Sequence, residues 1–158
     1  MRRVWLRVGT FLAVWLSVVS CARSAAADDR ALAPQARLQT VVDALRLLLE
    51  IPETVVATVV HADPLLLSVN PPAPSSSVFH LSADGPFLDT LTEHEIVAAV
   101  AHELGHVWVF THHPYLQTEQ LANEVAMRVV GRTSLERVYE KVWRRGGTKG
   151  DLAWFLGE

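Results

Sequence analysis

Two histidines and a glutamate stand close together near the middle of the chain, in the order His102, Glu103 and His106. On a helix the two imidazoles leave the same face one turn apart, because residues i and i+4 are neighbours on a helix surface. At that separation each imidazole can give one nitrogen to a zinc ion at about 2.0–2.1 Å. Glu103 lies at the edge of that face, where its carboxylate can reach a water molecule on the metal without binding the metal. The spacing predicts a zinc site with a general base beside it, which suits hydrolysis.

The residues around this motif predict a helix that begins after Thr92. Thr92 and Glu95 are spaced as the N-cap and N3 residues of a capping box. Apolar residues follow at helical spacing and form one stripe that we expect to be buried: Ile96, Val97, Val100, Leu104, Val107 and Trp108. Gly105 costs the helix about 1 kcal/mol relative to alanine. We therefore expect another part of the chain to approach the helix backbone closely at this glycine.

A catalytic zinc site usually has three protein ligands, and the sequence offers two main candidates for the third. His112 stands where the metzincin pattern has its third histidine, but Val109 replaces the glycine that turns the chain in that pattern. A β-branched residue is strongly disfavoured in such a turn. Glu119 and Asn123 share a face of the next predicted helix, so Glu119 can bind zinc while Asn123 accepts a hydrogen bond from a ligating imidazole. Glu124 as ligand, or a site with no third ligand, stays open as well.

The pair Glu119 and Asn123 resembles the gluzincin arrangement, in which a glutamate from the next helix is the third ligand. The stretch from Gly85 to His106 is similar to the HtpX and CAAX-prenyl-endopeptidase family of gluzincins, where a glycine-containing strand end precedes the A-H-E-L-G-H helix. Asn123, where that family has aspartate, is closer to the IrrE/ImmA-like peptidases. These resemblances imply a zincin-like fold, Zn²⁺ as the cofactor and a peptide or protein substrate. They also imply the metal ligands His102, His106 and Glu119.

The remaining elements can be predicted from periodicity. Helical patterns cover residues 34–50 and 116–130, a capping box at 133–136 opens a third helix that ends at 144–147, and residues 151–158 form a short one. Runs of β-branched and apolar residues predict strands at 54–60, 65–69 and 78–82. The pattern predicts an α+β domain over residues 28–158. In it, a short mixed or antiparallel sheet lies beside the motif helix and a following glutamate-bearing helix.

The first 27 residues have a different composition. Three arginines precede an apolar run from Val8 to Val19, which is typical of a signal peptide and short for a membrane span. Residues 18–21 resemble a bacterial lipobox, with possible cleavage before Cys21, whereas the alanines at 25–27 suit ordinary signal peptidase. Cys21 is the only cysteine, and lipid attachment would account for a lone thiol in an exported protein. We expect a periplasmic or outer-membrane lipoprotein with an N-terminal lipid anchor, rather than a fully secreted protein.

After this segment the chain has 17 acidic and 10 basic residues, a net charge of −7, which argues against a nucleic-acid partner. The motif and the resemblance predict a zinc metallopeptidase in which Glu103 takes a proton from a zinc-activated water. Zincin-like sites imply an extended substrate beside strand 78–82. His80, His113 and Tyr139 are candidates for stabilising the oxyanion. The rival hypothesis is a catalytically inactive, zincin-fold envelope lipoprotein that acts in binding or assembly.

Overall fold

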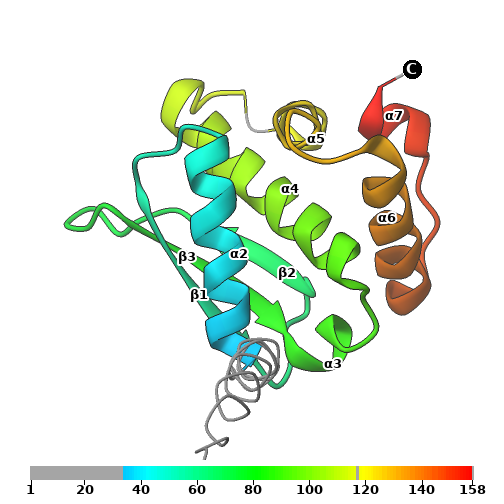
Figure 1. Cartoon of the computed structure of the whole chain (residues 1–158). Helices are drawn as coiled ribbons and strands as arrows, with labels where there is room; N and C mark the ends of the chain where they lie inside the picture. Colours follow the sequence, from blue (N-terminus) through cyan, green and yellow to red (C-terminus); the bar gives the residue numbers. More distant parts are fainter. Residues whose placement is uncertain (1–33, 117, 158) are drawn as a thin grey trace, which may run out of the picture. The chain divides into compact units, whose positions relative to one another are not determined.

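A three-stranded sheet and six helices make up the part of the chain that the computed structural model describes, residues 34–116 and 118–157 (Figure 1). This confirms the α+β class. The predicted signal peptide at 1–27, including Cys21, lies outside the described residues. Within the described part, no helix is both long enough and apolar enough to cross a membrane.

The sheet is mixed, with strand order β1-β3-β2. Strands β1 (Thr54–Val60) and β3 (Val78–Asp84) pair in parallel, and β2 (Leu67–Asn70) pairs antiparallel with β3. The expectation that a substrate adds to strand 78–82 is wrong, because this strand is central and both of its edges are already paired. Among the described residues β2 has the free edge beside α4.

One face of the sheet is buried and the other is open. On β1 the side chains of Val55 and Ala57 are buried and Val56 between them is exposed, as expected for the two-residue repeat of a strand. Phe79 and Leu81 of β3 lie beside them in register and are buried too. The covering helices are α2 (Pro34–Leu48), which packs on β1, and α4 (Glu93–His112), which packs on β2.

Helix α4 begins as predicted. The side chain of Thr92 accepts a hydrogen bond from the Glu95 N–H, and Glu95 accepts one from the Thr92 N–H, so the capping box is complete. The helix then runs without interruption through Val109 to His112. Before it, α3 (Gly85–Leu88) is one short helical turn that contains the buried Phe87. The continuous helix therefore leaves no turn at Val109, in agreement with the argument against a metzincin pattern.

The last three helices are α5 (Glu119–Ala126), α6 (Arg132–Gly146) and α7 (Leu152–Leu156). The second predicted capping box, at residues 133–136, is wrong. Its glutamate, Glu136, instead accepts a hydrogen bond from Arg132 at 3.0 Å, and the helix begins two residues earlier, with Gly131 as N-cap. Helix α5 is likewise shorter than the predicted 116–130, because Thr118 caps its start.

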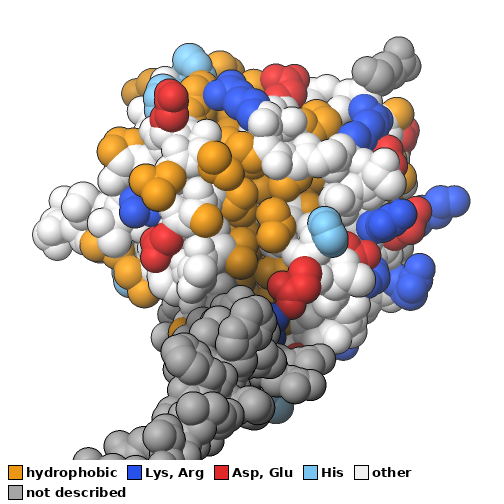
Figure 2. All heavy atoms as spheres, viewed as in Figure 1, with side chains coloured by type: hydrophobic (Ala, Val, Ile, Leu, Met, Phe, Trp, Pro, Cys, Tyr) orange, Lys and Arg blue, Asp and Glu red, His pale blue; other side chains and the backbone are white. Residues whose placement is uncertain are grey.

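Helix α6 is amphipathic. Its inner side buries Leu135 and Val138, whereas Lys and Arg side chains gather on its outer side, at the right edge of the face in Figure 2. Arg144 and Arg145 lie in its last turn, where positive charge is favourable beside the helix C-terminus. Gly147 then ends the helix in the left-handed conformation.

Candidate metal centre

Helix α4 carries both motif histidines and Glu103. His102 and His106 are one turn apart, and their ring centroids are separated by 4.8 Å. Their Nε2 atoms are 3.2 Å apart. The helix therefore directs the two imidazoles to a common point, next to the start of α5.

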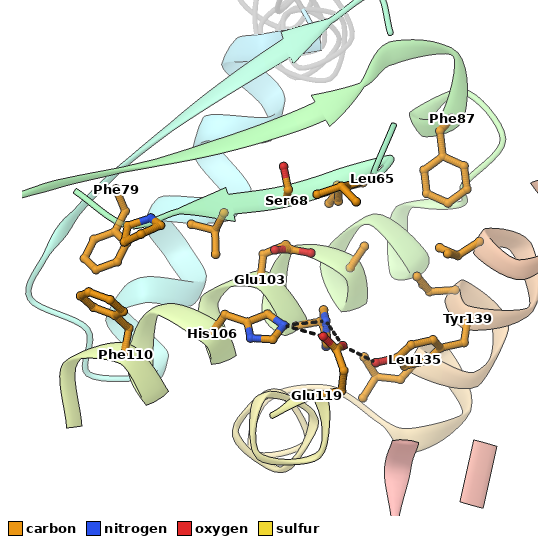
Figure 3. Close-up of a pocket in the computed structure, with 17 residues that line it drawn as sticks. Leu65, Ser68, Phe79, Phe87, Glu103, His106, Phe110, Glu119, Leu135 and Tyr139 are labelled. Atoms are coloured by element: carbon orange, nitrogen blue, oxygen red, sulfur yellow. Dashed lines mark hydrogen bonds and ion pairs between the residues drawn. The ribbon is translucent and has the colours of Figure 1, made fainter. Parts of the chain in front are cut away.

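Glu119, the first residue of α5, brings a carboxylate to this point. Its Oε2 atom lies 3.2 Å from Nε2 of His102, and its Oε1 atom lies 3.5 Å from Nε2 of His106 (Figure 3). Thr118 holds the helix start in place by accepting a hydrogen bond from the Leu121 N–H at 3.2 Å. Of the two main candidates for the third ligand, the structure thus brings Glu119 to the histidines.

These three side chains form a group that could hold a metal ion, with ligand atoms that all lie within 4.8 Å of one another. Tetrahedral ligands at about 2.0–2.1 Å from a zinc ion are roughly 3.3 Å apart. The separations of 3.2, 3.2 and 3.5 Å match that value. Two imidazole nitrogens with one carboxylate are also a donor set that hydrolytic zinc sites use. Distances and chemistry both fit a zinc ion.

The electrostatics of the group favour positive charge. Burial opposes a charged His102, yet its hydrogen bond to Glu119 and the nearby carboxylates raise the pKa of this imidazole overall. The hydrogen bonds from His102 and His106 hold the pKa of Glu119 well below its usual range. Both pKa shifts have the same cause: the negative carboxylate of Glu119 and the imidazoles facing it stabilise each other's charged forms. The same arrangement would favour a cation bound between these side chains.

Asn123 supports His102 from behind. Its side chain is completely buried, and its Oδ1 atom lies 2.8 Å from Nδ1 of His102. Its amide nitrogen donates to the hydroxyl of Tyr139 at 2.8 Å and to the backbone carbonyl of Phe155 at 2.9 Å. The Tyr139 hydroxyl in turn donates to Glu119 at 3.3 Å. One amide thus connects the histidine to α6 and α7.

Gly105 lets α5 approach α4 closely enough to form the group. A Cβ atom on Gly105 would lie 2.2 Å from the backbone oxygen of Ala122 and 2.9 Å from its Cα atom. The expected close approach at this glycine is therefore confirmed, and the approaching segment is α5. Because Ala122 lies between Glu119 and Asn123 on the same short helix, this contact sets the distance of both side chains from α4.

Glu103 lies in the cleft beside the histidines. Only 7% of the residue is exposed, and this burial raises the pKa of its carboxyl above the usual value, against the opposing effect of His102 and His106. The backbone N–H of Val69 on β2 faces the same carboxylate. A carboxylate whose pKa is moved towards neutrality is suited to accept and return a proton.

The cleft has a volume of about 560 Å³ and is lined mainly by apolar side chains. Figure 3 shows Phe79 and Phe110 at one end, beyond His106, and Phe87 and Leu135 towards the other end. The two phenylalanines at the first end meet edge to face, with ring centroids 5.6 Å apart. The lining contains neither lysine nor arginine. The walls would therefore contact bulky apolar groups on both sides of the metal-binding group.

The other candidate residues lie away from the metal-binding group. His112 is exposed and stacks on Trp108 with ring centroids 4.0 Å apart, while its Nδ1 atom lies 2.9 Å from the Trp108 carbonyl oxygen. Of the three oxyanion candidates only Tyr139 lines the cleft. The remaining alternatives are all exposed: His80, His113 and Glu124.

Sequence reasoning missed two contributors to the site. The first is the backbone carbonyl of Phe155, and a carbonyl leaves no signal in the residue types. The second is the pair Phe79 and Phe110 at the end of the cleft. Phe110 lies four residues after His106, so the i, i+4 spacing could have placed it on the metal-facing side of the helix.

A scan against models of protein families and a search of curated proteins find no match to this chain. A search of solved structures finds the crystal structure of the metallopeptidase zymogen of Pyrococcus abyssi abylysin, with a TM-score of 0.51 and 12% sequence identity. The similarity covers 72% of this chain and 99% of that one. At this identity it shows the fold alone, so the domain shares the fold of that zymogen. Membership of the HtpX-like or IrrE/ImmA-like families stays a prediction.

Proposed function

We propose that this chain is an exported zinc metalloendopeptidase. The observation that carries the proposal is the convergence of His102, His106 and Glu119, whose ligand atoms lie within 4.8 Å of one another. The buried Glu103 lies beside this group and is not one of the three ligands. A purely structural zinc site has no use for Glu103. The fold shared with a metallopeptidase zymogen supports the same class of activity.

In the proposed reaction His102, His106 and Glu119 hold the ion, which when bound would polarise the scissile carbonyl and acidify a water molecule. Glu103 takes the proton from the attacking water as the new C–O bond forms, and then passes it to the nitrogen of the leaving amine as the peptide C–N bond breaks. Burial and the adjacent Glu119 hold the pKa of Tyr139 well above its usual range. Its hydroxyl therefore stays protonated and can donate a hydrogen bond to the developing oxyanion.

The substrate we propose is an extended peptide with bulky apolar side chains on both sides of the scissile bond. The apolar ends of the cleft, at Phe79 and Phe110 and at Phe87 and Leu135, support this preference. Strand β2 has the free edge beside the site, and its Val69 N–H points into the cleft. An extended peptide could add to this edge through main-chain hydrogen bonds.

Export and lipid attachment remain part of the proposal. They rest on the signal-peptide pattern and on Cys21, the only cysteine of the chain. Lipid attachment at Cys21 would tether the peptidase domain to a membrane facing the periplasm, where peptide or protein substrates are accessible.

The experiment is metal analysis of the purified domain together with a hydrolysis assay. We expect about one zinc per chain, cleavage of a fluorogenic peptide with leucine or phenylalanine on both sides of the bond, and slower cleavage of a matched peptide with glycine at those positions. A chelator should abolish the activity and added zinc should restore it. Bound zinc without cleavage of any peptide in a library would contradict the proposal and favour the inactive lipoprotein.

A further inference from the structure

The backbone carbonyl of Phe155, in the C-terminal helix α7, accepts a hydrogen bond from the side-chain amide of Asn123 at 2.9 Å. The other half of the same amide meets Nδ1 of His102 at 2.8 Å. The C-terminal segment is therefore two hydrogen bonds away from a metal-binding imidazole. Asn123 is completely buried, so water does not compete for its polar atoms.

This carbonyl determines which way round the amide lies. A carbonyl oxygen can only accept a hydrogen bond, so the amide nitrogen must face Phe155 and the amide oxygen must face His102. The Tyr139 hydroxyl, the third neighbour of the amide, can both donate and accept and so does not select an orientation. With the amide oxygen against Nδ1, His102 must carry a proton on Nδ1, so Nε2, the atom directed at Glu119 and His106, is the nitrogen that could give its lone pair to a metal ion.

Helix α7 is held in position by contacts at both of its ends. At its C-terminal end, the guanidinium of Arg132 donates to the carbonyl oxygens of Leu156 at 3.2 Å and Gly157 at 2.7 Å. At its start, Asp151 accepts hydrogen bonds from the backbone of the first turn. The ring of Phe155 packs against Tyr139, with centroids 5.1 Å apart. Arg132 thus holds the two carbonyls that directly follow the Phe155 carbonyl in the chain.

We propose that Arg132 and the C-terminal helix are positioning elements of the metal centre, which fix the Asn123 amide and through it the tautomer of His102. The inference rests on the zinc site of the proposed function, but it concerns metal affinity and not catalysis. It makes the last residues of the chain part of the site that binds the metal. Anything that detaches α7 should weaken zinc binding while the α4 and α5 ligands remain present.

The test is zinc affinity, measured on the full-length protein by competition with a chromogenic chelator. Arg132→Gln should weaken zinc binding, and Arg137→Gln should leave it unchanged. Arg137 is a matched control because it lies exposed on the same helix and makes no hydrogen bond or ion pair with the described residues. Asn123→Leu should weaken binding by roughly 10–100-fold, as is typical for residues that orient a ligand. In the Asn123→Leu background, Arg132→Gln should add nothing, because the connection is already broken.

Equal zinc affinity in the wild type and Arg132→Gln would overturn the proposal, and so would a full additional loss in the double variant. A second measurement does not depend on the folding of any variant. In the zinc-free wild type, long-range ¹⁵N–¹H spectra should show a proton on Nδ1 of His102, whether or not Nε2 also carries one. A His102 whose Nδ1 carries no proton would also overturn the proposal. If the wild type binds no zinc at all, the proposed function itself fails, and this outcome is distinct from the other three.

Discussion

Gly105→Ala tests whether the contact between α4 and α5 positions the metal ligands. The added Cβ atom would stand 2.2 Å from the Ala122 oxygen, 2.8 Å from its carbonyl carbon and 2.9 Å from its Cα atom. All three are backbone atoms, so no side chain can rotate away. To restore ordinary van der Waals contact the two helices must separate by roughly 1 Å. Because Glu119 belongs to α5, its carboxylate then moves away from His102 and His106 on α4.

The magnitude follows from two opposing effects. Alanine is favoured over glycine in a helix by about 1 kcal/mol, whereas overpacking a tight contact costs about 1–3 kcal/mol. We expect a net loss of about 1–2 kcal/mol in the free energy of unfolding. Because a shift of roughly 1 Å is half the length of a zinc–oxygen bond of about 2.0–2.2 Å, zinc affinity should fall by at least roughly tenfold.

The assay is urea unfolding of the zinc-free protein together with chelator competition for zinc. Gly146→Ala is the control, since Gly146 also lies in a helix and an added Cβ atom would meet only the Thr148 hydroxyl, at 3.6 Å. It should leave stability and zinc affinity unchanged or slightly raise stability. A Gly105→Ala protein with wild-type stability and zinc affinity would refute the claim that this glycine sets the distance between the helices.

Three further predictions concern other parts of the molecule. Glu119→Ala should lose zinc on dialysis while His112→Ala keeps it, because His112 stacks on Trp108 away from the site; zinc stoichiometry decides between the two residues. Although burial opposes it, hydrogen bonds from Lys141 and from the helix start hold the pKa of Glu95 at about 2, below the ordinary 4.5. A lowered pKa stabilises the fold above pH 4.5, so the stability advantage of the wild type over Glu95→Gln should vanish as the pH falls from 4.5 towards 2 in urea titrations. Cys21→Ser should release the protein from membranes into the soluble fraction; a wild type that is already soluble would contradict lipid attachment.

The parts of the site that could be predicted are those that depend on local spacing. The i, i+4 pairs His102 with His106 and Glu119 with Asn123 each lie on a single helix, so helical geometry alone placed each pair on one face. The helical cost of Gly105 predicted a close neighbour for the same local reason. Val109 disfavoured a turn, and the structure has none there.

The parts that could not be predicted depend on contacts between distant segments. The pairing that makes β3 the central strand joins residues far apart in the sequence, and a strand pattern does not reveal its partner. Arg132 contacts carbonyls 24 and 25 residues later in the chain. Arg132 is the first residue of α6, whereas the pattern at 133–136 predicted a later start for this helix. The carbonyl of Phe155 is available to Asn123 only because α7 returns to α5.

The most direct test of the central claim is a comparison of Glu103→Gln with His102→Ala, in which zinc content and peptide hydrolysis are measured on the same samples. Glutamine keeps the size of the glutamate but cannot accept the proton, and it leaves the three metal-binding side chains intact. Glu103→Gln should therefore bind zinc like the wild type and lose about 10²–10⁴-fold in kcat/KM. His102→Ala should lose metal and activity together. Wild-type turnover in Glu103→Gln, or loss of zinc as complete as in His102→Ala, would contradict the role of Glu103 as general base.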